Sequence, residues 1–140
     1  LALLDGKTEL NLPERSVCDT CPTIRKSKKS TGDLKRILES PEFDPEKPVD
    51  EMRCLLEQGF MCLGPVTRAG CSGMTGTAPR CIATRVPCRG CYGPIKDGAL
   101  PLVDYVGALS TVGYDPRKMV DRRGFLCRFN GAHSVLRKIG

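Results

Sequence analysis

Hydrophobic and polar positions follow a helical period in only a few places along this chain. In residues 32–40 (GDLKRILES) three aliphatic side chains fall on one helix face, which predicts a short amphipathic helix that ends before Pro41. Residues 51–58 (EMRCLLEQ) lie between Asp50, a suitable N-cap, and Gly59, a suitable C-terminal stop. This second stretch is therefore also predicted to be a helix.

Two more helices are predicted towards the C-terminal end. Residues 100–112 (LPLVDYVGALSTV) carry a stripe of Leu, Val and Tyr side chains at helical spacing. Residues 115–123 (DPRKMVDRR) begin with Asp115 as an N-cap and Pro116 at the first helical position. Both stretches follow the glycine- and proline-rich middle of the chain.

That middle, from Cys62 to Pro94, shows no lasting helical or alternating period. The chain contains 15 Gly and 11 Pro, but only three Tyr, four Phe and no Trp, so much of its backbone is expected to form loops around a small core. The expected fold class is a small, loop-rich domain with a few short helices and little or no sheet. Such a core needs an additional stabilising element.

The length of 140 residues fits a single domain. The opening LALLDG is typical of a helix end that stops at Gly6. Residues 1–12 are therefore expected to be the end of an upstream domain and a linker, followed by one domain over residues 13–140. No stretch approaches the roughly 20 apolar residues that span a bilayer, and no export signal is recognisable.

The formal net charge of +6 raises nucleic acid as a partner. The basic residues are spread along the chain, however, with few aromatic side chains among them, which disfavours a nucleic-acid interface. If eight cysteines bound two four-iron clusters, each oxidised cluster with its thiolates would carry about −2, and the net charge would fall to roughly +2. A single histidine and the lack of a phosphate-binding loop give no support to a catalytic site.

The nine cysteines carry most of the information. Two C-x2-C pairs are separated by four single cysteines, and one further cysteine stands apart. Eight thiols make two sets of four, which suits either tetrahedral zinc or four-iron clusters. Because four-cysteine zinc sites are usually built from two close pairs, the four single cysteines favour iron–sulfur clusters, while zinc and disulfides remain alternatives. In chain order the nine are Cys18, Cys21, Cys54, Cys62, Cys71, Cys81, Cys88, Cys91 and Cys127.

The motif CLLEQGFMCLGPVTRAGC, followed by PCRGCYGP, resembles the C-terminal iron–sulfur domain of NiFe-hydrogenase small subunits. The resemblance runs from Pro13 to about Pro94. Within that family the chain is most similar to the gamma subunits of archaeal F420-non-reducing (methyl-viologen-reducing) hydrogenases. The small subunits of F420-reducing hydrogenase and sulfhydrogenase are near relatives.

The resemblance implies two 4Fe-4S clusters with separate ligand sets. Many relatives have histidine where this chain has Cys18, and relatives with a three-iron medial cluster have proline where it has Cys81. The family also has a flavodoxin-like N-terminal domain with a third, proximal cluster, and residues 1–140 are not expected to include that domain. The distal ligands would be Cys18, Cys21, Cys54 and Cys62. The medial ligands would be Cys71, Cys81, Cys88 and Cys91.

The function implied by the resemblance is electron relay in a cytoplasmic hydrogenase complex of methanogenesis. The partners would be the nickel–iron large subunit and a downstream iron–sulfur or flavin acceptor of the heterodisulfide-reductase type, with no nucleic acid and no membrane. This chain itself would carry no catalytic nickel site. The alternative from a different class is a zinc-stabilised interaction module with no redox role.

Other residues near the cysteines have two interpretations each. Four arginines close to the ligands would either tune the cluster potentials or serve as surface and ion-pair residues. Tyr92 is expected to shield a cluster from water, His133 to be a surface or interface residue, and Cys127 to be a buried or interface thiol and not a ligand. The four arginines are Arg68, Arg80, Arg85 and Arg89.

Overall fold

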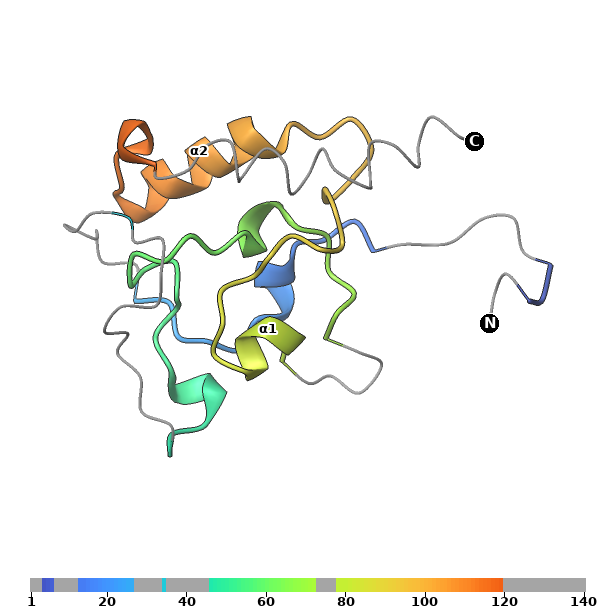
Figure 1. Ribbon diagram of the computed structural model, residues 1–140, viewed down its shortest axis with the longest axis horizontal. Helices are drawn as coiled ribbons and strands as arrows, with labels where there is room; N and C mark the ends of the chain where they lie inside the picture. Colours follow the sequence, from blue (N-terminus) through green and yellow to red (C-terminus); the bar gives the residue numbers. More distant parts are fainter. Residues whose placement is uncertain (1–3, 7–12, 27–33, 35–45, 73–77, 120–140) are drawn as a thin grey trace.

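The computed structural model describes residues 4–6, 13–26, 34, 46–72 and 78–119 (Figure 1). Within these ranges the backbone forms short helices and turns and no β-strand. This architecture matches the predicted loop-rich fold class. The elements are the 3-10 turns η1 (Val17–Thr20), η2 (Val49–Glu51) and η3 (Gly64–Val66), the helices α1 (Arg80–Ala83) and α2 (Pro101–Val112), and the 3-10 turn η4 (Pro116–Lys118).

Helix α2 confirms the helix predicted at residues 100–112. Pro101 occupies its first turn, where the missing N–H costs nothing, and Gly113 ends it in the left-handed conformation at φ 97°. The Gly113 N–H donates to the carbonyls of Leu109 and Ser110, both at 3.1 Å. Tyr105 and Leu109 are fully buried on the inner face of the helix, so α2 is held by packing as well as by its caps.

The helix predicted at residues 51–58 is wrong. The backbone around Met52 and Cys54 is extended and pairs with Ile24, whose N–H donates to the Met52 carbonyl at 2.9 Å and whose carbonyl accepts from the Cys54 N–H at 2.8 Å. This pairing with a distant segment outweighs local helix propensity. Only the predicted stop is confirmed, since Gly59 is left-handed at φ 96° and ends a set of turns.

The other two helix predictions fall largely outside the described residues. Asp115 caps the following turn as predicted, accepting from the Arg117 N–H at 2.9 Å, but the turn is 3-10 in type and Met119 is extended. Residues 120–123 lie outside the described part of the chain. So does the helix predicted at 32–40, except for the buried Leu34.

Three distant segments meet at residues 67–69. The Val17 N–H donates to the Thr67 carbonyl at 2.8 Å, and on the other side the Arg68 N–H donates to the Gly93 carbonyl at 2.9 Å. Helix α2 packs against η3, and η3 packs against η1. Figure 1 shows α2 on one side of this centre and α1 on the opposite side. No helix in the described ranges is both long and apolar enough to cross a bilayer.

Candidate metal centre

All eight cysteines predicted as ligands lie in described segments, and all are free thiols. Cys62 and Cys88 are buried, Cys91 is exposed, and the other five are half-buried. Cys127 and His133 lie outside the described residues, so their predicted roles stay predictions.

The first C-x2-C pair is arranged by the turn η1. The Asp19 carboxylate accepts from both the backbone N–H and the hydroxyl of Ser16, at 2.7 and 2.9 Å, and so fixes the start of the turn. The Cys21 N–H donates to the Cys18 carbonyl at 3.3 Å. The Cys21 thiol also lies 3.1 Å from the Thr23 hydroxyl. Both cysteines therefore sit on one rigid turn.

Gly64 lies close to two cysteines that are far apart in the sequence. A Cβ atom placed on Gly64 would lie 3.0 Å from the Cys18 sulfur and 3.6 Å from the Cys62 sulfur. Burial is the main cause of the raised pKa of Cys18, and the Cys21 and Cys54 thiolates add to it by repulsion. Cys18 and Cys62 thus lie on either side of Gly64, and the pKa of Cys18 is also raised by the charge of Cys88. We call the four cysteines predicted as distal ligands the first thiol group.

The remaining four cysteines, which we call the second thiol group, influence one another's pKa values. The pKa of Cys88 is raised mainly by burial and further by the charges of Cys81 and Cys71. The pKa of Cys91 is raised by burial and by the same two thiolates. This second thiol group is the set predicted as medial ligands. Among the described residues, no three His, Cys, Asp or Glu side chains are close enough together to hold a single metal ion.

The two groups touch through Cys62 and Cys88. The backbone N–H of Cys88 donates to the Cys62 sulfur at 3.3 Å, and this contact is buried. After burial, the charge of Cys88 is the largest effect that raises the pKa of Cys62. The backbone N–H of Cys88 therefore links a cysteine of one thiol group to a cysteine of the other.

The surroundings of the sulfurs suit a thiolate-bound group. Burial raises the pKa of Cys18 to about 12 and that of Cys62 well above 9.0, so both sulfurs stay protonated thiols unless a bound cation favours the thiolates. Backbone N–H groups also point at the sulfurs and lower their pKa values, among them those of Gly64 for Cys62 and Gly90 for Cys88. Such N–H···S bonds tune iron–sulfur clusters.

Sequence reasoning missed two residues at the first group. Arg25, which was not among the arginines singled out in the sequence, donates through its guanidinium to the Cys18 carbonyl, and its charge lowers the otherwise raised pKa of Cys18. Gly64 stands two residues after Cys62, and this spacing within CLGPVT could have indicated a close approach to sulfur.

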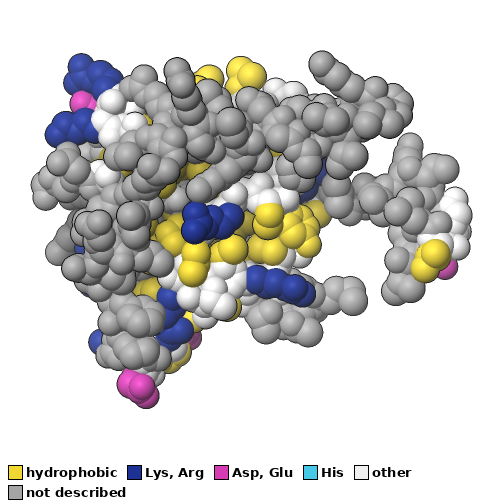
Figure 2. Space-filling model, in the orientation of Figure 1, with side chains coloured by type: hydrophobic (Ala, Val, Ile, Leu, Met, Phe, Trp, Pro, Cys, Tyr) yellow, Lys and Arg dark blue, Asp and Glu magenta, His cyan; other side chains and the backbone are white. Residues whose placement is uncertain are grey.

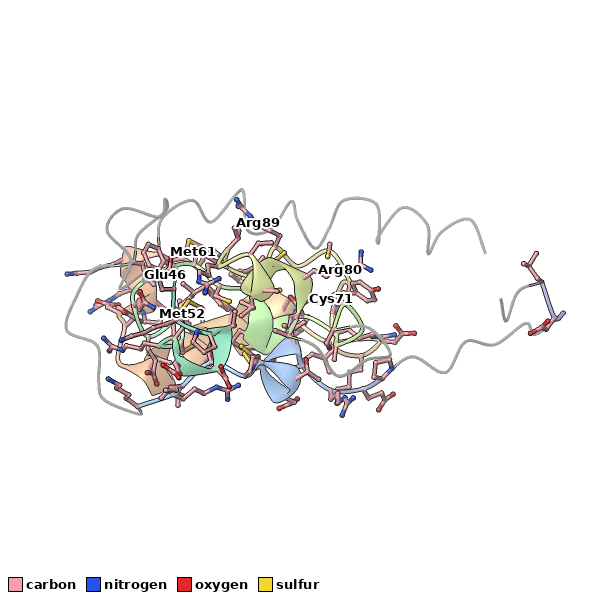
Figure 3. All side chains as sticks on the ribbon, turned by 90° about the horizontal axis from the view of Figure 1, so that it is seen from below. Glu46, Met52, Met61, Cys71, Arg80 and Arg89 are labelled. Atoms are coloured by element: carbon pink, nitrogen blue, oxygen red, sulfur yellow. The ribbon has the colours of Figure 1, made fainter. Side chains whose placement is uncertain are left out.

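Two of the four arginines near the ligands bind backbone. Arg68 Nε donates to the carbonyls of Pro94 and Ile95, at 3.1 and 2.9 Å. The Arg85 guanidinium donates to the Lys47 carbonyl. The other two, Arg80 and Arg89, are exposed, and Figure 3 shows Arg89 pointing away from the described chain.

The described residues form a small, loop-rich domain with eight free cysteines. No protein-family model matches the chain. It is 33% identical to a subunit of the vhu F420-non-reducing hydrogenase of Methanococcus voltae, over 99% of this chain and 43% of that protein. It is 38% identical to the subunit of the same name from Methanocaldococcus jannaschii, over 92% of this chain and 40% of that protein.

A third relative is named for its cofactor. The iron-sulfur subunit of the F420-non-reducing hydrogenase of Archaeoglobus profundus is 32% identical over 68% of this chain and 28% of that protein. The resemblance seen in the sequence is confirmed: the chain belongs to the family of these F420-non-reducing hydrogenase subunits, and two of the matches cover nearly its whole length. It spans less than half the length of these relatives.

Proposed function

We propose that this chain is part of an electron-relay subunit of a NiFe-hydrogenase, an oxidoreductase, and that it holds two 4Fe-4S clusters. The first thiol group would bind the distal cluster and the second would bind the medial cluster. Each cluster, when bound, would take up and release one electron at a time. The ligands are Cys18, Cys21, Cys54 and Cys62 for the first cluster and Cys71, Cys81, Cys88 and Cys91 for the second.

The contact between Cys62 and Cys88 is the observation that carries this proposal. A relay needs its redox centres close together and away from water, and here one buried cysteine of each proposed ligand set contacts the other. The chain contributes burial, N–H donors to the sulfurs, and the rigid turn η1 that carries the first pair. These features are the ones by which proteins set cluster spacing and potential.

The charge of the surrounding segment supports the same function. No Asp or Glu occurs between Glu57 and Asp97, the stretch that contains five of the eight thiols, whereas Arg and Lys recur along it. Figure 2 shows Lys and Arg side chains beside a band of hydrophobic ones on one face, with acidic side chains at its edges. Such surroundings balance the negative charge of a cluster and its thiolates.

The partners follow from the relay. The electron donor would be the nickel–iron large subunit, through a proximal cluster outside this chain, and the acceptor would be an iron–sulfur or flavin protein of the heterodisulfide-reductase type. The complex would work in the cytoplasm, and methanogenesis fits the Methanococcus and Methanocaldococcus sources of two of the relatives. A small subunit of an F420-reducing hydrogenase or a sulfhydrogenase is the alternative within the family.

Metal and sulfide analysis of the anaerobically prepared protein tests the proposal. We expect about eight iron and about eight sulfide for these two groups, with the broad visible absorption of 4Fe-4S centres. A colourless protein with bound zinc would instead support the zinc-stabilised interaction module. About seven iron with a three-iron signal in the oxidised protein would contradict the assignment of Cys81 as a ligand.

A further inference from the structure

The ring of Tyr92 lies directly against the backbone of Gly70. A Cβ atom placed on Gly70 would lie 2.5 Å from Cε1 and 2.8 Å from Cδ1 of Tyr92, distances at which the ring or the backbone must move. Gly70 also has φ +154°, a conformation that side-chain-bearing residues rarely adopt. The structure at this point therefore requires glycine for two independent reasons.

This contact joins the two loops that carry Cys71 and Cys91. The segments before and after it are paired, since the Arg68 N–H donates to the Gly93 carbonyl at 2.9 Å and Thr67 forms an antiparallel bridge with Pro94. Gly70 directly precedes Cys71, and Tyr92 directly follows Cys91. The contact between Tyr92 and Gly70 therefore continues the association of the two segments up to Cys71 and Cys91.

Core packing does not account for the position of this ring. The Tyr92 side chain is 46% exposed, and Gly70 and Cys91 are exposed as well. The ring is instead held against the backbone of Gly70, at the surface and one residue from each of Cys71 and Cys91. The remaining sulfurs of the group are half-buried or buried.

We propose that Tyr92 and Gly70 are positioning residues for the cluster of the second thiol group. Their contact sets the separation of Cys71 and Cys91, and the ring limits the access of water and chelators to the cluster. This inference rests on the proposed function and goes beyond it, because it assigns cluster retention to two residues that donate no ligand. The phenol oxygen has no part in it, so phenylalanine should serve equally well.

The test compares variants of the full-length protein loaded anaerobically with iron and sulfide. Iron release to a chelator, the paramagnetic resonance spectrum and the reduction potential of each cluster are measured. In Gly70→Ala and Tyr92→Ala we expect about half of the iron to leave on the order of 10-fold faster or more. The potential of that one cluster should become more positive because it is more exposed, while the other cluster keeps its iron. Tyr92→Phe should match the wild type.

Two controls separate the contact from general damage. Gly98→Ala places a side chain at φ +78° with nothing within 4 Å, so it imposes backbone strain without a steric contact and should release iron at the wild-type rate. The double variant Gly70→Ala/Tyr92→Ala removes the clash and keeps only the backbone strain at residue 70, so it should release iron more slowly than the two single effects combined would give. If Gly70→Ala fails to fold, Tyr92→Ala and Tyr92→Phe still decide the question.

Several results would overturn the inference. These are wild-type retention in Tyr92→Ala, equal loss from both clusters, or a Tyr92→Phe variant as labile as Tyr92→Ala. A wild-type protein that takes up no iron would overturn the proposed function and this inference with it. Two normal clusters in the wild type with no effect of Tyr92→Ala would overturn this inference alone.

Discussion

The sulfur of Cys62 accepts a hydrogen bond from the backbone N–H of Cys88 at 3.3 Å, inside the protein. The two residues belong to different thiol groups and lie on segments that are far apart in the sequence. A change of charge in one group is therefore felt directly by the other, because the dielectric screening between buried groups is weak. In the proposed relay, the reduction of one cluster would shift the potential of its neighbour.

Gly64→Ala should weaken the first thiol group selectively. The added methyl carbon would stand 3.0 Å from the Cys18 sulfur and 3.6 Å from that of Cys62, so one sulfur has to shift. We expect the iron of the distal cluster to be held roughly 10-fold less tightly, as measured by release to a chelator. Gly107→Ala is the matched control, since nothing lies within 4 Å of its added carbon. Equal iron retention in both variants would contradict this role of Gly64.

The first thiol group should be the exit for electrons. Cys18 lies on η1 and Cys21 directly follows it, and the exposed residues Ile24, Arg25 and Lys26 come next in the chain. Cys18→Ser or Cys21→Ser should therefore slow reduction of the downstream partner while hydrogen isotope exchange at the nickel–iron subunit stays nearly intact. Loss of both activities would indicate collapse of the assembly, and loss of neither would place the exit at the other cluster.

Elements set by local signals could be predicted from the sequence, and elements set by distant pairing could not. Pro101 and Gly113 delimit α2 by their own backbone restrictions, so the helix was predictable. The failure at residues 51–58 has its cause at Ile24, a residue too far away in the sequence to appear in any local pattern.

The candidate site divides in the same way. Spacing alone indicated eight thiols in two sets of four and favoured clusters over zinc, but the family resemblance was needed to say which cysteines go together. The contact of Gly64 with two sulfurs and that of Tyr92 with Gly70 depend on the three-dimensional approach of separate loops. No spacing rule contains such contacts.

Removal of iron should unfold much of the domain. The described core is built around loops, and its buried residues include the predicted ligands Cys62 and Cys88, so metal binding is expected to supply a large share of the folding free energy. Chelation under reducing conditions should abolish the cooperative thermal transition and alter the far-UV circular dichroism. A metal-free chain that keeps both would show that the polypeptide packing suffices.

Acid should accelerate the loss of iron. Burial raises the pKa of Cys18 to about 12, and it also raises the pKa values of Cys54, Cys62 and Cys88 above 9.0. A thiol with a raised pKa takes up a proton readily once its metal bond breaks, so protons compete better with iron as the pH falls. Iron release in a chelator assay should therefore speed up steadily from about pH 8 to about pH 6. A release rate that does not depend on pH would contradict this competition.

The positions of the two thiol groups along the chain have a consequence for the order in which they bind their clusters. The second thiol group is complete within one stretch, from Cys71 to Cys91, whereas the first needs Cys18 to return to Cys62 across a loop more than twice as long. Each doubling of a loop adds about 0.6 kcal/mol of closure entropy, and distant contacts form late during folding. The C-terminal half should thus capture its cluster first. When iron is supplied at half the full amount, it should accumulate in the second thiol group. Paramagnetic resonance spectra should then lose their signal in Cys88→Ser and keep it in Cys54→Ser.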